Sequence, residues 1–141
     1  MKDIREVYPV DEESGFWAPS DYGPLLESFG YERVLQCDDH DWQGDSFVLF
    51  KNGEQIGYLE FGWGSCSGCD MLQGCGSYEE LAELQRNLHN SIKWLPLPEM
   101  REYFYAHDWE GDFLWYSEAG REFVPKARVW LDEALLASGH E

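Results

Sequence analysis

The chain is poor in basic side chains. It has 10 Lys and Arg against 28 Asp and Glu in 141 residues, which gives a formal net charge of −18 at pH 7. A charge of this sign repels the phosphates of nucleic acids and of anionic lipids. We therefore expect no direct binding to nucleic acid or membrane, and we expect a basic protein as the partner. The alternative is that the acidity only keeps the chain in solution.

Long apolar runs are also missing. No stretch approaches the roughly 18 consecutive apolar residues of a membrane-spanning helix. The first six residues, Met1 to Glu6, do not show the apolar core of a signal peptide. We therefore expect a cytoplasmic protein whose thiols stay reduced. Its four cysteines then indicate metal ligands, reactive thiols or small buried residues before they indicate disulfides.

Aromatic residues, by contrast, are plentiful: seven Trp, eight Tyr and eight Phe, enough to build the core of a single domain over residues 1–141. We expect an α+β fold, with a three- to four-stranded antiparallel meander and helices packed on one face. Residues 1–20 are expected to be mostly irregular. The patterns predict strands over 31–37, 46–50, 55–62 and 112–116, and helices over 24–30, 77–90, 99–106 and 117–138.

Local signals fix several of these boundaries. Asn52-Gly53 is typical of a tight hairpin, and Ser77-Tyr78-Glu79-Glu80 is a capping box that begins a helix. Residues 94–98 contain two prolines and indicate an extended connection. Pro125 either kinks the last helix or marks its true start.

Antiparallel connectivity predicts one functional region. The first strand ends, the second begins and the third ends at the same end of the meander. Cys37, His40 and the acidic turn that follows should therefore lie near the glycine-rich loop of residues 64–76.

That loop has the spacing of a metal site. Cys66-x2-Cys69, with Cys75 further on, would let several sulfurs reach one tetrahedral ion such as zinc. Cys37 or His40 would supply the fourth ligand. Two alternatives stay open: reduced cysteines that only hold the loop together, or a reactive thiol.

A short sequence occurs twice. His40-Asp41-Trp42-Gln43-Gly44-Asp45 returns as His107-Asp108-Trp109-Glu110-Gly111-Asp112. One interpretation is simply a good turn sequence. The other is a pair of acidic corners around a shared site, formed by Asp39, Asp41, Asp45, Asp108 and Asp112. Trp42 and Trp109 are then candidates for binding a partner, or they fold down as plugs of their loops.

The loop itself carries a resemblance. It begins Gly62-Trp63-Gly64-Ser65-Cys66-Ser67-Gly68-Cys69-Asp70 and continues with Leu72-Gln73. The stretch from Asp41 to Gln73, and above all this part of it, resembles a group of small acidic proteins of phages and actinobacteria. The resemblance extends through the helix after Ser77 and through residues 107–111, but it leaves out the first 30 residues, and Cys37 departs from the pattern.

Two functional hypotheses result. The resemblance implies a phage accessory protein that binds a host factor, and the charge suggests that this factor is basic. The first hypothesis is therefore a non-enzymatic accessory or anti-defence protein that engages a basic host protein, with the cysteine loop as a structural clasp. The alternative is a Cys- or metal-dependent enzyme centred on Cys66, Cys69 and Cys75 and on the corner Asp39-His40-Asp41.

Overall fold

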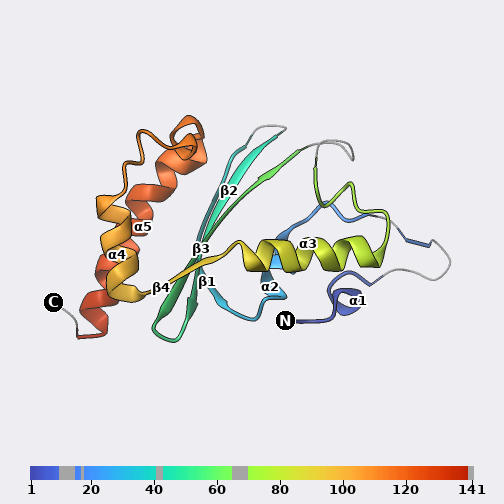
Figure 1. Ribbon diagram of the computed structural model, residues 1–141, viewed down its shortest axis with the longest axis horizontal. Helices are drawn as coiled ribbons and strands as arrows, with labels where there is room; N and C mark the ends of the chain where they lie inside the picture. Colours follow the sequence, from blue (N-terminus) through green and yellow to red (C-terminus); the bar gives the residue numbers. More distant parts are fainter. Residues whose placement is uncertain (10–14, 17, 41–42, 65–69, 140–141) are drawn as a thin grey trace.

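A four-stranded antiparallel sheet lies at the centre of the protein (Figure 1). The structure, a computed structural model, describes residues 1–9, 15–16, 18–40, 43–64 and 70–139. The strands are β1 (Glu32–Asp38), β2 (Gly44–Asn52), β3 (Gln55–Trp63) and β4 (Lys93–Pro96), and they lie side by side in chain order. The predicted α+β class and the antiparallel meander are confirmed.

The predicted hairpin joins β2 to β3, with its loop one residue later than expected. Asn52 still pairs with Gln55, so the two loop residues are Gly53 and Glu54. Gly53 has a φ of +63°. A positive φ at the first loop position is typical of a type II′ turn, which favours glycine there. The Asn-Gly pair therefore marked the hairpin correctly but placed its turn one residue early.

The fourth strand differs from the prediction. It lies at Lys93–Pro96, where an extended connection was expected. Its Trp94 pairs with Gly57 of β3, and the missing side chain of Gly57 leaves room for the indole, since a Cβ there would lie 2.9 Å from the ring. Residues Phe113–Tyr116 instead form a 3-10 helix, η1. The Asp112 carboxylate begins it by accepting a hydrogen bond from the N–H of Leu114 at 3.0 Å.

In the described part of the chain, five α-helices surround the sheet. They are α1 (Ile4–Val7), α2 (Gly23–Glu27), α3 (Tyr78–Asn90), α4 (Leu97–Ala106) and α5 (Glu118–Ala137). The last four match predicted helices, whereas α1 was not expected. The Ser77 hydroxyl caps α3 by accepting a hydrogen bond from the N–H of Glu80 at 3.3 Å, as the capping box predicts. Pro125 lies inside α5 and does not mark its start. Within the described ranges, no helix combines the length and the apolar character that a membrane span requires.

Helices cover both faces of the sheet, not the single face expected (Figure 1). Phe47 and Leu49 of β2 face α4 and α5 in a group of buried side chains that we call the α4–α5 core. Val48 and Phe50 point the other way, into the α2–α3 core. An uninterrupted apolar run such as residues 47–50 is typical of a strand that is buried on both sides.

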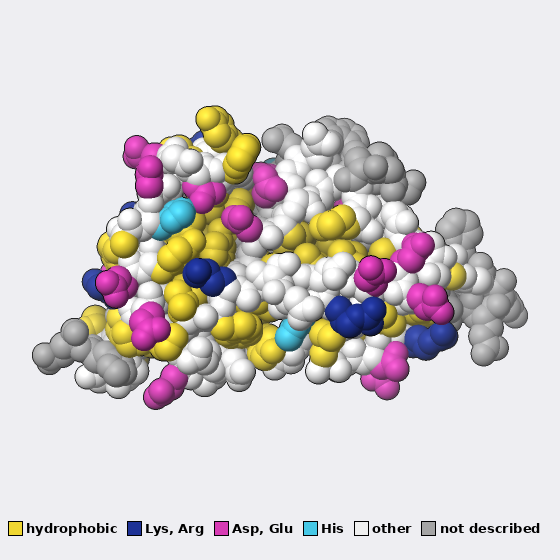
Figure 2. Space-filling model, viewed as in Figure 1, with side chains coloured by type: hydrophobic (Ala, Val, Ile, Leu, Met, Phe, Trp, Pro, Cys, Tyr) yellow, Lys and Arg dark blue, Asp and Glu magenta, His cyan; other side chains and the backbone are white. Residues whose placement is uncertain are grey.

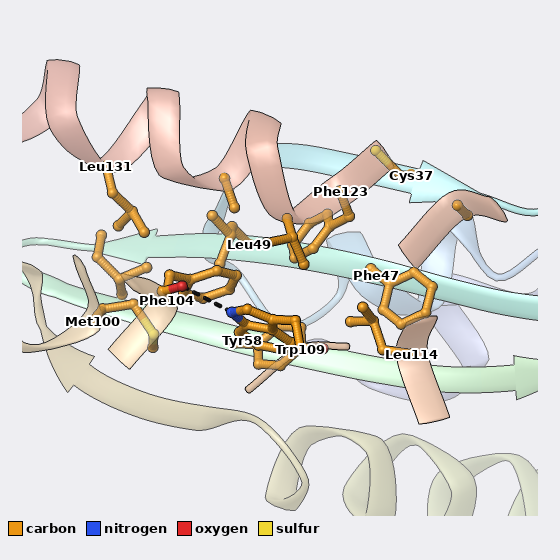
Figure 3. Packing of buried hydrophobic residues seen from close by; sticks show 14 of the residues in the cluster. Cys37, Phe47, Leu49, Tyr58, Met100, Phe104, Trp109, Leu114, Phe123 and Leu131 are labelled. Carbon is orange, nitrogen blue, oxygen red and sulfur yellow. Dashed lines mark hydrogen bonds between the residues drawn. The ribbon is translucent and has the colours of Figure 1, made fainter. Parts of the chain in front are cut away.

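Aromatic rings dominate the α4–α5 core (Figure 3). The ring centroids of Phe104 and Trp109 lie 4.9 Å apart, and those of Tyr58 and Phe123 lie 5.7 Å apart. The Trp109 indole N–H donates to the backbone carbonyl of Phe104 at 2.8 Å, shown as the dashed line in Figure 3. This core fixes α4, α5 and the turn between them against β2 and β3.

Candidate functional site

Two of the predicted metal ligands lie on opposite faces of the sheet. Cys37 is buried in the α4–α5 core, opposite Phe47 in the strand register. Cys75 is buried in the α2–α3 core, where its thiol donates to the backbone carbonyl of Met71 at 3.3 Å. A metal site that uses both Cys37 and Cys75 is therefore ruled out by the strand between them. Cys66 and Cys69 lie outside the described residues.

Among the residues that the structure places, no group of three or more His, Cys, Asp and Glu side chains could hold a metal ion. His40 is exposed beside Asp39 at the start of the β1–β2 connection. A zinc site that includes Cys66 and Cys69 stays a prediction. Such a site cannot include both Cys37 and Cys75.

Asp39 is a structural clamp. Its carboxylate accepts hydrogen bonds from the N–H of Asp45 at 2.9 Å, the N–H of Ala119 at 3.0 Å and the hydroxyl of Ser117 at 2.8 Å. Burial by itself would raise the pKa of Asp39, but these three donors favour the ionised form and leave its pKa below the usual value. The acidic corner thus ties the β1–β2 loop to the first turn of α5.

The other members of the acidic corner play different parts. Asp45 is exposed, and its pKa is raised by partial burial and by the charge of Asp39. Asp108 accepts a hydrogen bond from the N–H of Gly111 at 3.2 Å. Asp112 caps η1, and its Oδ2 lies 2.8 Å from Nε2 of His107. The second copy of the repeated sequence is thus a turn closed by its own side chains. Asp41 lies outside the described residues.

Trp109, predicted to bind a partner, is not available to one. Its side chain is only 4 % exposed, and its indole N–H is already paired within the α4–α5 core. The reason is that the turn folds back onto α4, so the ring stacks beside Phe104 (Figure 3). Trp42, the other candidate, lies outside the described residues.

Among the residues that the structure describes, the two most exposed aromatic side chains lie elsewhere. Phe113 is 90 % exposed and Tyr116 is 87 % exposed, both on η1, with ring centroids 6.4 Å apart. The predicted strand had assigned them to the sheet. Asp112, a helix N-cap residue directly before the aromatic run, was the signal in the sequence that could have identified the helical turn.

η1 packs against the start of α5. Its buried residue, Leu114, lies directly against Gly120 of α5, where a Cβ would come within 2.3 Å of the Leu114 carbonyl oxygen. The Arg121 guanidinium donates to the carbonyl of Trp115 at 2.7 Å. With these contacts on its inner side, η1 presents Phe113 and Tyr116 to the solvent.

Carboxylates surround the two rings. A cavity of about 220 Å³ on one side is lined by Asp45, Glu60 and Phe113, among others. A wider one of about 690 Å³ is lined by Asp39, Asp45, Tyr116 and Glu118, and also by the basic Arg121. We call Phe113, Tyr116, Asp45, Glu60 and Glu118 the η1 surface. Figure 2 shows exposed hydrophobic side chains standing out at this end of the molecule, with acidic side chains around them.

The two cavities together offer two exposed aromatic rings, the carboxylates of Asp39, Asp45, Glu60 and Glu118, and the guanidinium of Arg121. No protein-family model, curated protein or solved structure matches the chain.

Proposed function

We propose that the protein is a small acidic binding protein that engages a basic protein through the η1 surface. The observation that carries the proposal is the almost complete exposure of Phe113 and Tyr116 on a fixed helical turn. Large aromatic side chains at the centre of a patch, with polar groups at its rim, are typical anchors of protein interfaces.

The chemistry around the rings supports a cationic partner. Asp45, Glu60 and Glu118 would attract Lys and Arg side chains at the rim. An Arg guanidinium can also stack on the face of a Phe or Tyr ring. The net charge of −18 adds a long-range attraction that raises the association rate. The expected partner surface therefore presents Arg or Lys beside apolar side chains.

We also propose a biological role for this binding. A cytoplasmic phage accessory or anti-defence protein, whose cysteine loop is a structural clasp, would act by occupying the basic surface of a host protein. The support for this setting is the resemblance of residues 41–73 to small acidic phage and actinobacterial proteins.

Binding to defined cationic probes tests the proposal. The probes are an array of short peptides in which Lys and Arg flank aromatic or aliphatic residues, with the same peptides carrying Glu in place of Lys and Arg as controls. We expect the cationic peptides alone to bind. Their affinity should fall steeply between about 50 and about 300 mM salt, because attraction between exposed charges is screened over this range.

Variants then locate the binding site. Phe113→Ser/Tyr116→Ser should weaken binding by at least about tenfold, since interface anchors contribute about 2 kcal/mol or more. Leu136→Ser is the matched control, because Leu136 is 72 % exposed at the far end of α5, and it should bind like the wild type. Salt-independent binding, or equal binding of the double variant and the wild type, would sink the proposal.

A further inference from the structure

We infer that the outer edge of β1 binds an extended, basic segment of a partner protein as a fifth strand of the sheet. None of the residues involved belongs to the η1 surface, so this inference is independent of the function proposed above. In the part of the chain that the structure describes, β1 pairs only with β2. The free edge of a strand presents backbone groups that a further strand can pair with.

β1 is the more open of the two edges. The opposite edge strand, β4, has four residues and ends in Pro96, which cannot donate a hydrogen bond. β1 has seven residues and contains no Pro, and its basic side chain, Arg33, is paired with Glu27 at 3.1 Å. One irregularity in its register, between Arg33 and Leu35, is the feature that interrupts its edge.

The register identifies the backbone groups that are free to pair. The Asp39 N–H donates to the Asp45 carbonyl at 3.1 Å, so this pair faces β2. The direction of the backbone groups alternates along an antiparallel strand. Cys37 therefore also faces β2, whereas Gln36 and Asp38 direct their N–H and C=O groups outward.

An apolar groove runs beside this edge. Its volume is about 370 Å³, and it lies between Leu35 of β1 and the outer side of α5, where Val129 and Trp130 form its apolar part and Lys126 and Glu133 also line it. Lys126 is already paired with Glu122 on the same helix. Val129 is 57 % exposed. In strand addition the backbone supplies affinity, and a pocket for alternate side chains supplies specificity. The groove would take an apolar side chain of the added strand.

The acidic residues at the ends of β1 favour a basic segment as the added strand. Glu32 and Asp38, at the two ends of β1, are both exposed. A second copy paired antiparallel about Leu35 would place Glu32 opposite Asp38, and like charges in such positions are destabilising. The net charges of two copies would also repel each other. A segment with alternating apolar residues and Lys or Arg at each end fits both the groove and the two carboxylates.

Amide hydrogen exchange on the full chain tests the inference directly. The probe is the synthetic peptide acetyl-Lys-Ile-Thr-Val-Thr-Ile-Lys-amide, and its control has Pro in place of Val, which removes a backbone donor. At up to about 1 mM peptide, the exchange rates of the Gln36 and Asp38 amides should fall by at least about tenfold. The Pro peptide should leave them unchanged. If the first peptide does not protect these two amides, the inference is overturned.

A pair of variants tests the groove. Val129→Lys places a bulky positive charge in it and should weaken peptide binding by about tenfold or more. Leu136→Lys makes the same charge change on the same helix outside the groove and should bind like the wild type. Equal binding by the two variants overturns the inference. So does protection of Gln36 and Asp38 that rises with protein concentration in the absence of peptide, because a second copy would then be the occupant.

Discussion

The carboxylate of Asp39, just after β1, accepts a hydrogen bond from the backbone N–H of Ala119 at 3.0 Å, in the first turn of α5. The two residues are 80 positions apart in the sequence. The same carboxylate holds the hydroxyl of Ser117, the N-cap residue of α5. Because η1 ends directly before Ser117, this contact also positions the two exposed aromatic rings.

Removing this acceptor should destabilise the fold. We expect Asp39→Ala to lower the free energy of unfolding by about 1–2 kcal/mol, because the first turn of α5 loses an acceptor and Ser117 a partner. Urea denaturation measures the change. Glu83→Ala, which removes the same charge from an exposed position of α3, is the control. Equal stability of the two variants would contradict the role of Asp39.

The same carboxylate predicts a pH dependence. Burial raises the pKa of Asp39, but hydrogen bonds from Ala119, Asp45 and Ser117 bring it below the ordinary value of about 3.9. A lowered pKa contributes stability that is present above the ordinary value and lost as the pH falls through the folded-state value. The difference in unfolding free energy between wild type and Asp39→Asn should therefore be constant near neutral pH and shrink below about pH 4. A difference that persists into strong acid would disagree with this origin.

Asp45 should behave in the opposite way. Partial burial and the neighbouring charge of Asp39 raise its pKa, so its ionised form is less stable in the folded protein than in the unfolded chain. Asp45→Asn should raise the unfolding free energy at neutral pH by less than about 1 kcal/mol, since the group is exposed. The gain should vanish below the ordinary pKa of about 3.9. Thermal unfolding at pH 7 and at low pH measures both values, and a loss of stability at pH 7 would contradict the prediction.

Gly120 supports η1 through its lack of a side chain. A Cβ at this position would lie 2.3 Å from the backbone oxygen of Leu114, which cannot move without moving η1. We expect Gly120→Ala to destabilise the protein by about 1–3 kcal/mol, although the same change in an open helix position is stabilising. Val129→Ala, at an exposed position of the same helix, is the control. A stabilised Gly120→Ala variant would show that η1 does not rest on α5.

The two described cysteines should be unreactive. Burial raises the pKa of the thiol of both Cys37 and Cys75, so little of the reactive thiolate forms at neutral pH. Mass spectrometry after a timed reaction with iodoacetamide should find both much less modified in the folded protein than in urea. Rapid modification of Cys75 in the folded state would favour the alternative of a cysteine-dependent enzyme.

Local sequence signals predicted most of the fold. The Asn52-Gly53 pair and the apolar pattern around it identified β2 and β3, and Ser77 identified the start of α3. The prediction of a strand at residues 112–116 was wrong. Its aromatic residues favour a strand, but Asp112 caps a helical turn there and Leu114 packs against Gly120 of α5. β4 depends on the pairing of Trp94 with Gly57, a long-range contact that no local pattern contains.

The site was predicted less well, for a related reason. Antiparallel connectivity brings the β1–β2 loop and the end of β3 together, as expected. It does not determine on which face of the sheet each cysteine is buried. Cys75 is buried in the α2–α3 core, whereas Cys37 is buried in the α4–α5 core. Likewise, nothing in the repeated His-Asp-Trp turn shows that Trp109 folds onto Phe104, while Phe113 remains outside.

An NMR titration of the full chain with the cationic peptide that binds it most tightly tests the η1 surface most directly. We expect the largest shifts of side-chain signals at Phe113 and Tyr116, with backbone shifts at Asp45, Glu60 and Glu118. Saturating binding that leaves the signals of both rings in place would contradict binding at the η1 surface.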